Sequence, residues 1–316
     1  MNYKWRNTGI GKVDNLGRQL EKTFKGARQG SIETRWRYAE AGERFIRHVG
    51  ENFGLQKIQN ISDKHLESYA LELKERGCAD KYIKNELAAI RYIHNQIPQA
   101  RYGLADSKAF NKSIGLQSTP DGRADRAWTE EEFKEMRQVA IANARRDIVK
   151  TMDAIRHTGM RLDEACTLKR NEVENALRTG ILHLENTKGG RPRDIELTEE
   201  ARNVLEVVIK DVPRAGYVFT PQKYWDKGIH RFEASVQRFM CNHRHEVQEP
   251  DRNQSAHNVD PEEKAPLTVH GLRHMYAREE FERKIEEGKT EHQARQELAV
   301  VLGHGRESVT HIYLSK

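Results

Sequence analysis

The sequence predicts a mainly α-helical fold with a small antiparallel sheet, organised as two domains. Apolar residues recur at helical spacing along most of the 316-residue chain, and only two short stretches have the character of paired strands. A chain of this length is long enough for two cores. Charged residues form 32% of the chain and aromatic residues 7%, a composition typical of a soluble, helix-rich protein.

The charge distribution separates a basic first part from a nearly neutral second part. Residues 1–118 contain 21 Lys and Arg against 13 Asp and Glu, a balance of +8. Residues 119–316 contain 33 against 35, a balance of −2. This pattern fits a module that binds a polyanion, joined to a module with a specific activity. Surface charge that simply varies along the chain is the alternative, and charge alone favours nucleic acid only slightly.

Composition excludes several classes of protein. No apolar stretch approaches the roughly 20 residues of a membrane span, and the N-terminal region lacks the apolar core of a signal sequence. The three cysteines, Cys78, Cys166 and Cys241, are scattered, and none has a neighbour at the spacing of zinc ligands. They argue against a disulfide framework and indicate a reducing cytoplasm.

Residues 1–118 are predicted to form a small helical bundle with basic residues on the outside. Four helices are expected, at residues 15–25, 31–52, 63–76 and 79–97. Ser62 is the expected N-cap of the third helix, Gly77 its stop, and Pro98 closes the fourth. The basic residues between the apolar positions are also what an ordinary solvated helix face would carry.

The boundary between the domains is predicted in residues 111–127, a polar stretch containing glycine and proline, with residues 119–127 as the linker. Residues 128–316 form the second predicted domain. It is expected to begin with a capping box of Thr129 and Glu132 and to contain further helices ending at His157 and spanning 199–210 and 230–245. Residues 246–266 are acidic and contain proline, so we expect a mobile loop there.

Gly159 and the residues after it predict a turn into a short helix that begins near Arg161. Glu164, one helical turn further, could accept hydrogen bonds from that guanidinium or from nearby backbone. Two strands are expected at residues 181–185 and 193–197, joined by a glycine-rich hairpin that carries Lys188 at its tip. An ordinary surface ion pair and a merely solvated lysine are the alternatives for these residues.

The C-terminal stretch holds the densest group of residue types that bind phosphate. It contains His270, Arg273 and His274, then Leu302-Gly303-His304, and nine residues later Tyr313. A guanidinium offers a planar fork of donors to phosphate oxygens, and imidazoles donate hydrogen bonds or move protons near neutral pH. A tyrosine hydroxyl can form a covalent intermediate if a neighbouring group accepts its proton.

Six residues of these types follow one another in a fixed order behind the basic helical domain: Arg161, Lys188, His270, Arg273, His304 and Tyr313. Together they resemble the tyrosine recombinase (phage integrase) family, over essentially the whole chain. The resemblance implies a helical core-binding (SAM-like) domain over residues 1–118 and a catalytic domain over residues 128–316, which form a C-shaped clamp around DNA. It implies a site-specific recombinase or integrase that cuts and rejoins DNA through a 3′-phosphotyrosyl intermediate.

The resemblance assigns the chemistry of cleavage to four residues. Tyr313 would attack the scissile phosphate, and Lys188 would protonate the leaving 5′-oxygen. Arg161 and Arg273 would hold the non-bridging oxygens, where charge develops in the transition state. Neither a cofactor nor a metal is expected, because fixed cations replace magnesium and the covalent bond conserves the energy of the phosphodiester.

The remaining residues are given supporting roles by the same resemblance. His270 would assist removal of the tyrosine proton, and His304 would hydrogen-bond a phosphate oxygen. Glu164 matches the family's acidic position beside the first arginine. His274 also fits the family pattern, and we expect it to support the site from behind because His270 is the more plausible reactive imidazole.

The partners implied by the resemblance are double-stranded DNA with inverted core sites, a homodimer on each site and a homotetramer in synapsis. Directionality or host factors are expected in addition, and a membrane is not. The implied setting is the cytoplasm of a prokaryote, on the nucleoid, with the gene carried by a phage or mobile element. Because only three residues follow Tyr313, we expect subunits to couple through surfaces other than a long C-terminal tail. The short stretch before the first long helix predicts a single class of core DNA site per subunit.

Other functions stay open on the sequence alone. A type IB topoisomerase-like enzyme or a hairpin telomere resolvase would use similar chemistry, although the Leu-Gly-His motif and the short segment around Tyr313 favour recombination. A metal-dependent hydrolase is another alternative, and its metal ligands would be His270, His274, His304 and His311. The sequence lacks the glutamate that a zincin motif places between its first two histidines, which argues against this function. A catalytically silent DNA-binding protein is the third alternative, and the complete set of reactive residues argues against it.

Overall fold

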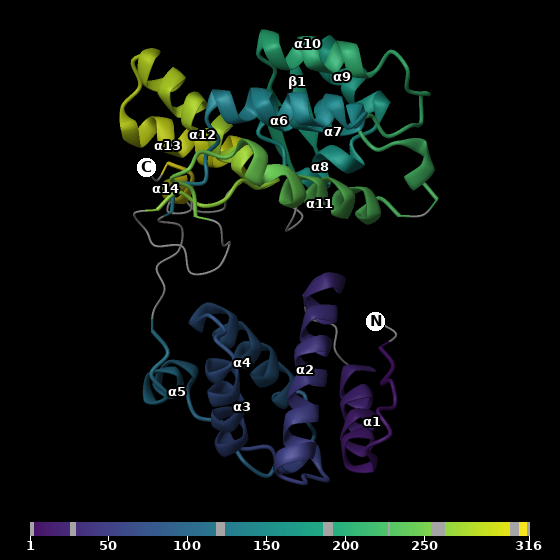
Figure 1. Cartoon of the computed structure of the whole chain (residues 1–316), viewed down its shortest axis with the longest axis vertical. Coiled ribbons are helices and arrows are strands. Elements are labelled where there is room, and N and C mark those ends of the chain that lie inside the picture. The colour runs from purple at the N-terminus through teal and green to yellow at the C-terminus, as the bar shows by residue number, and fades with distance from the viewer. Residues whose placement is uncertain are drawn as a thin grey trace. The chain divides into compact units, whose positions relative to one another are not determined.

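The computed structural model describes residues 3–25, 30–117, 124–185, 192–226, 228–253, 263–303 and 310–314. The chain divides into two compact units, residues 1–120 and 121–316, each with its own hydrophobic core. Among the described residues the fold is helical with one two-stranded antiparallel sheet, so the predicted fold class is confirmed (Figure 1). No helix in this described part of the chain is long and apolar enough to cross a membrane.

Unit 1 is a bundle in which α2 packs against its neighbours α1, α3 and α4 (Figure 1). Its helices are α1 (Gly11–Lys25), α2 (Ile32–Asn52), α3 (Asp63–Glu75), α4 (Asp80–His94) and α5 (Ser107–Ser113), with a 3-10 turn η1 (Ile58–Asn60). Leu16, Phe45, Leu66 and Ile90 meet in the core of the bundle. The four predicted helices are confirmed, because each repeats apolar residues at helical spacing over several turns.

Unit 1 differs from the prediction in three places, one of which is the end of the fourth helix at His94 rather than residue 97. The first helix begins at Gly11 rather than residue 15, because Asp14 accepts hydrogen bonds from the Thr8 and Gly9 backbone N–H groups and folds the preceding chain onto the helix start. Helix α5 was not predicted and enters the stretch assigned to the boundary. Asp106 caps this helix. The helix has seven residues and buries Phe110, so it is too short to show a periodic pattern of apolar residues.

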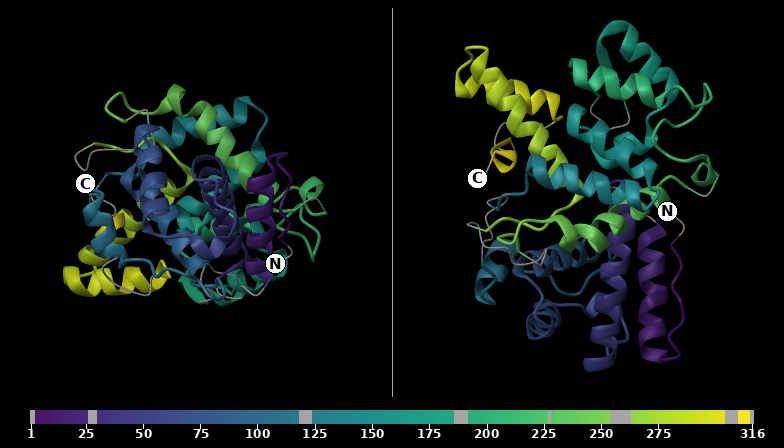
Figure 2. Two further views of the ribbon diagram at one scale, coloured as in Figure 1. Left: turned by 90° about the horizontal axis from the view of Figure 1, so that it is seen from below. Right: turned by 45° about the horizontal axis from the view of Figure 1, so that its top comes forward.

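Unit 2 is built around α7, which packs against α6, α8, α10 and α12. Its helices are α6 (Glu130–Ala142), α7 (Arg146–Thr158), α8 (Leu162–Thr167), α9 (Arg170–Thr179), α10 (Glu199–Val208), α11 (His230–Val247), α12 (Val269–Glu286), α13 (Glu291–Val301) and α14 (Thr310–Tyr313), with a 3-10 turn η2 (Gln222–Tyr224). Met152, Phe232 and Leu272 are fully buried in its core. Helices α12, α13 and α14 pack together in the region drawn in yellow (Figure 2).

The sheet of unit 2 is a hairpin of β1 (Ile181–Leu184) and β2 (Arg193–Glu196), each slightly shorter than predicted. Leu184 pairs with Arg193, and Ile181 pairs with Glu196. Burial alternates along both strands, so Leu182 and Ile195 face the core. Arg193 shares the inward face with Ile195, and this orientation brings its charged side chain into the unit.

The expectation of a mobile loop over residues 246–266 is wrong for the described part of that stretch. Helix α11 continues to Val247, and Arg252 is buried. Its guanidinium donates to both carboxylate oxygens of Glu132, at 2.5 and 2.6 Å, and to the carbonyls of Ala127 and Ala265, at 2.7 and 2.8 Å. This anchor leaves no local pattern in the sequence, because Glu132 and Ala127 lie 120 and 125 residues from Arg252 along the chain.

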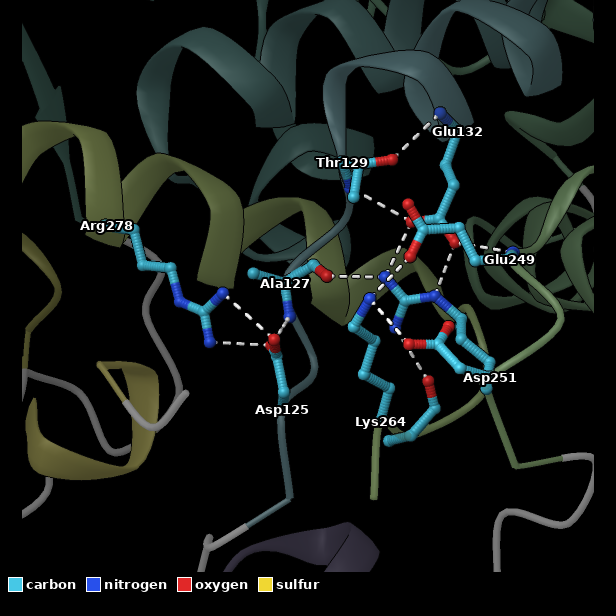
Figure 3. A network of polar contacts seen from close by, with 10 residues as sticks. Asp125, Ala127, Thr129, Glu132, Glu249, Asp251, Lys264 and Arg278 are labelled. Atoms are coloured by element: carbon cyan, nitrogen blue, oxygen red, sulfur yellow. Dashed lines mark hydrogen bonds and ion pairs between the residues drawn. The ribbon is translucent and has the colours of Figure 1, made fainter. Parts of the chain in front are cut away.

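A network of polar contacts continues from this anchor toward α12 (Figure 3). Lys264 lies beside Glu249 and Asp251, with Nζ to oxygen distances of 2.5 and 2.9 Å. Arg278, on α12, faces Asp125 at 2.6 Å. Unit 2 therefore fixes the chain on both sides of the start of α12, the helix that carries several of the predicted site residues.

Candidate active site

Gly159 makes the turn that positions Arg161. It ends α7 with φ of 62°, in the left-handed region that favours glycine. A Cβ atom at this position would come within 2.3 Å of the Tyr276 ring, so the close packing of α12 requires glycine as well. Arg161 follows as the N-cap residue of α8, as predicted.

Glu164 accepts hydrogen bonds from both the backbone and the side chain of Arg161. The backbone N–H lies 2.7 Å from one carboxylate oxygen, and Nη1 lies 2.8 Å from the other. Glu164 is only 2% exposed, so the alternative of an ordinary surface ion pair is wrong. The carboxylate instead fixes the direction of Arg161 from inside the unit.

Arg193 is a buried partner of Glu164 that sequence reasoning missed. Its Nη1 and Nη2 donate to the two carboxylate oxygens at 2.6 and 2.5 Å. Burial alone would raise the pKa of Glu164, but the hydrogen bonds and charges of Arg193 and Arg161 lower it to about 2. One signal was present in the sequence, since Arg193 has the same strand parity as Ile195 and a buried arginine needs a partner.

Arg273 is fully buried and joins the ends of two helices. Its Nη1 donates to the carbonyl of Gly159, after α7, and its Nη2 donates to the carbonyl of Leu302, after α13. Carbonyls at helix C-termini lack partners within the helix and carry partial negative charge, so they can accept from a buried guanidinium. Burial lowers the pKa of Arg273 to about 10, and the group stays charged at neutral pH.

The carbonyl of Leu302 brings the predicted arginines together. It accepts from Arg273 and also from Nη2 of Arg161, at 3.3 Å. With Arg193, three guanidiniums and the Glu164 carboxylate give this cluster a formal charge of +2. Within the described residues, the Nε groups of Arg193 and Arg273 are buried without a hydrogen-bond partner. The cluster therefore carries the positive charge that binding of an anion requires.

Tyr313 lies in this cluster at the end of α14. Its hydroxyl is 3.1 Å from Nε2 of His270, and the side chain is buried. The Tyr313 ring stacks on His274, with 4.3 Å between centroids, and the guanidinium carbon of Arg273 lies 5.6 Å from its centroid. Packing against Leu298 and Leu302 holds the ring in place.

The two histidines of α12 meet Tyr313 in different ways. His270 is exposed and contacts the hydroxyl, whereas His274 is buried and contacts the face of the ring. Burial, reinforced by the charges of His270 and the nearby arginines, lowers the pKa of His274 to about 2, so this ring is neutral. An unprotonated Nε2 on His270 could accept the proton of the Tyr313 hydroxyl.

Four of the six predicted reactive residues therefore meet in one place: Arg161, His270, Arg273 and Tyr313. Lys188 and His304 lie outside the described residues. Among the described residues, no group of three or more His, Cys, Asp or Glu side chains is placed to hold a metal ion. All three cysteines are free, as their scattered positions predicted.

Comparison with known families identifies the class of protein. The profile of the phage integrase family matches residues 128–316, and the N-terminal phage integrase profile matches residues 13–102. The chain belongs to the phage integrase family, the tyrosine recombinases.

Individual relatives are distant in sequence. Tyrosine recombinase XerC of Bacillus pumilus (strain SAFR-032) is 26% identical over 200 residues, which are 61% of this chain and 59% of the relative. The Tn1549 transposon integrase in complex with transposon right end DNA has a TM-score of 0.63 at 16% identity over 95% of each chain. A lambda integrase dimer bound to a COC′ core site has a TM-score of 0.65 at 16% identity, over 95% of this chain and 94% of that chain. These two structures share the fold.

Proposed function

We propose that this chain is a site-specific DNA recombinase that cuts and rejoins DNA through a 3′-phosphotyrosyl intermediate. One observation carries the proposal: the Tyr313 hydroxyl lies 3.1 Å from His270 Nε2, beside two arginines that meet at the Leu302 carbonyl. A nucleophile, a proton acceptor and fixed positive charge are the groups needed for transfer of a phosphoryl group to tyrosine. Membership of the phage integrase family supports the same activity.

In the cleavage step, the Tyr313 hydroxyl oxygen attacks the scissile phosphorus and the bond from phosphorus to the 5′-oxygen breaks. The phenolic proton passes to Nε2 of His270, which is within hydrogen-bond distance. The stacked, neutral ring of His274 holds the phenol in the direction of attack and adds no competing charge. The product is a tyrosine ester of the 3′-phosphate and a free 5′-hydroxyl.

Arg161 and Arg273 bind the non-bridging oxygens in this proposal. Negative charge grows on those oxygens in the transition state, and preorganised donors stabilise it without having to reorient. Their contacts with Glu164, Gly159 and the Leu302 carbonyl fix both guanidiniums before DNA binds.

The resemblance of the sequence to the family adds Lys188 and His304 to the proposed reactive residues. Lys188 gives a proton to the departing 5′-oxygen, and His304 donates a hydrogen bond to a phosphate oxygen. In the second step, the 5′-hydroxyl of another strand attacks the phosphotyrosine and releases Tyr313. The phosphodiester energy is conserved in the ester, so the proposed reaction requires neither a nucleotide nor a metal.

The proposed partner is duplex DNA with inverted core sites, bound by a dimer at each site and by a tetramer in synapsis. The DNA-bound lambda integrase dimer and Tn1549 integrase have the same fold, which supports this assignment. The charge balance of +8 in residues 1–118 fits a role for unit 1 in holding the DNA backbone. We assign the protein to a phage or other mobile element and its action to the cytoplasm.

A covalent-capture assay tests the proposed function. Bound sequences are selected from a pool of random duplexes, prepared with a nick near the cleaved position, and incubated with protein in EDTA. We expect a protein–DNA adduct that survives denaturation. Tyr313→Phe should abolish the adduct and keep DNA binding, because only the attacking oxygen is removed. Tyr224→Phe is the matched control, since it removes a hydroxyl near Phe232 and should leave the adduct unchanged.

The alternatives give different results in the same assay. An adduct formed by Tyr313→Phe would refute the nucleophile assignment. Cleavage that appears only with an added divalent metal would favour the hydrolase. Relaxation of supercoiled DNA without exchange of strands between duplexes would favour the topoisomerase-like function. Binding with no adduct on any selected duplex would indicate a silent DNA-binding protein.

A further inference from the structure

Arg193 occupies an inward-facing position at the base of the β1–β2 hairpin. It is the first residue of β2, paired with Leu184, and its side chain is only 2% exposed. All of its described polar contacts go to Glu164, through two nearly parallel hydrogen bonds of 2.6 and 2.5 Å. This bidentate geometry fixes the carboxylate in one plane, which a single hydrogen bond would not do.

Glu164 transmits that constraint to Arg161. The same two carboxylate oxygens accept the Arg161 backbone N–H at 2.7 Å and its Nη1 at 2.8 Å. Four donors from two arginines therefore share one buried carboxylate. If Arg193 were removed, burial would favour the protonated carboxyl, and Glu164 would no longer hold the Arg161 guanidinium by charge.

Arg193 also contacts the backbone that orients the second arginine. Gly303 has φ of 64°, and a Cβ atom there would lie 3.0 Å from Cδ of Arg193. The preceding carbonyl, that of Leu302, accepts from both Arg161 and Arg273. The Arg193 side chain thus packs against the chain segment where the two phosphate-binding arginines meet.

We propose that Arg193 is a positioning residue for strand cleavage, which holds Arg161 through Glu164 and supports the Leu302 carbonyl shared by Arg161 and Arg273. The inference rests on the proposed function and extends it to a residue of the hairpin. Its consequence concerns charge: Arg193 acts on the guanidiniums that stabilise the negative non-bridging oxygens. Its removal should therefore matter only when those oxygens carry negative charge.

A neutral substrate separates this role from a merely structural one. Single-turnover cleavage is measured on the nicked duplex and on the same duplex with a methylphosphonate at the scissile position. The bonds made and broken are the same, but the methyl group replaces a charged oxygen. For Arg193→Gln we expect cleavage of the phosphodiester to slow by about 10²-fold, the effect of displacing a reacting group by about 1 Å. DNA affinity should change little, and the methylphosphonate should react within a few-fold of the wild-type rate.

Two further variants keep the test decisive if Arg193→Gln is unstable. Arg193→Lys retains the charge but loses the bidentate fork, so we expect it to restore part of the phosphodiester rate. Arg252→Gln is the matched control, because Arg252 forms an equally buried bidentate pair with Glu132. It should lower the melting temperature but leave the ratio of the two cleavage rates at its wild-type value.

Three results would overturn the inference. Arg193→Gln could cleave the phosphodiester as fast as the wild type. It could slow both substrates equally, as a general loss of structure would. Arg252→Gln could change the rate ratio as much as Arg193→Gln does. If the wild type forms no adduct, the proposed function itself is refuted. That outcome differs from the three above, because no wild-type cleavage rate then exists with which to compare the variants.

Discussion

At the residue scale, Glu164 shows how one carboxylate allows several guanidiniums to lie together in a buried place. Arg161 and Arg193 both donate to it, and Arg273 reaches the same cluster through the Leu302 carbonyl. A buried ion pair contributes little net stability compared with apolar packing, but removing one partner is expensive. The arrangement therefore has a stability that depends on the ionisation of Glu164.

The pH dependence of folding tests this directly. The folded-state pKa of Glu164 is lowered from 4.5 to about 2, which corresponds to a stabilisation on the order of 3 kcal/mol. Because the folded-state value lies below the unfolded one, this stabilisation is complete above about pH 4.5 and is lost as the pH falls toward 2. We expect Glu164→Gln to be less stable than the wild type at pH 7 and nearly equal to it near pH 2, in urea unfolding followed by circular dichroism.

Glu174→Gln provides the matched control, because Glu174 pairs with Arg170 on the surface of α9. Such exposed pairs contribute about 0–1 kcal/mol, so this variant should stay close to the wild type at every pH. A stability difference for Glu164→Gln that does not change between pH 7 and pH 2 would contradict the account.

The residue types of the site could be predicted from the sequence, but their connections could not. The order of Arg161, Arg273 and Tyr313 and the chemistry of their side chains predict a phosphate-binding group. Arg193 shares its strand parity with Ile195, but this property distinguishes it only once one face of the strand is known to be buried. The pairing with Glu164 joins residues 29 apart and has no local pattern.

At the element scale, the site is built from helix ends. Helices α7 and α13 end at glycines in the left-handed conformation, Gly159 and Gly303. The carbonyls of Gly159 and Leu302 point at Arg273 on α12, so a single side chain links three helices. The short helix α14 then brings Tyr313 against α12 and α13.

Gly159→Ala tests the requirement for this helix end. The left-handed conformation costs a non-glycine residue roughly 1–2 kcal/mol. The added methyl would also meet the Tyr276 ring, at 2.3 Å. Gly180→Ala is matched in backbone strain, with φ of 80° after α9, but its nearest neighbour would be an Arg202 nitrogen at 3.8 Å. It should lower the melting temperature by about 2–4 °C.

We expect Gly159→Ala to lower the melting temperature by clearly more than Gly180→Ala and also to slow covalent capture of DNA. The additional loss has a structural reason, because displacement of Tyr276 moves α12 and with it His270 and Arg273. Equal melting temperatures for the two variants would show that α12 adapts without disturbing the helix end.

The elements that could be predicted are those whose apolar residues repeat regularly along the sequence. Helices α2 and α4 repeat apolar residues over several turns, and the hairpin strands flank a glycine-rich turn. Helix α9 was missed although it has ten residues, because it buries only Val173 and Ala176. The acidic residues and proline around Arg252 predict a loop, because its partner Glu132 on α6 is distant in the sequence.

At the scale of the whole molecule, the proposed function assigns binding of the DNA backbone to unit 1 and strand cleavage to unit 2. The net positive charge lies in unit 1, which has fewer acidic residues than unit 2 and a hydrophobic core of its own. Unit 2 is nearly neutral overall but places a formal charge of +2 at the buried cluster of Glu164 and its arginines. General affinity for the backbone and specific stabilisation of one phosphate would then arise from different parts of the chain.

Salt dependence distinguishes the two contributions. A protein that neutralises several phosphates releases their counterions, so the logarithm of the binding constant falls linearly with the logarithm of salt concentration. We expect a steep slope for the full chain on random duplex DNA between about 50 and 200 mM NaCl. A fragment of residues 121–316, shown by circular dichroism to be folded, should bind more weakly and with a shallower slope. Equal slopes would place the main DNA-binding charge in unit 2, and a flat response of the full chain would contradict backbone binding by the basic unit.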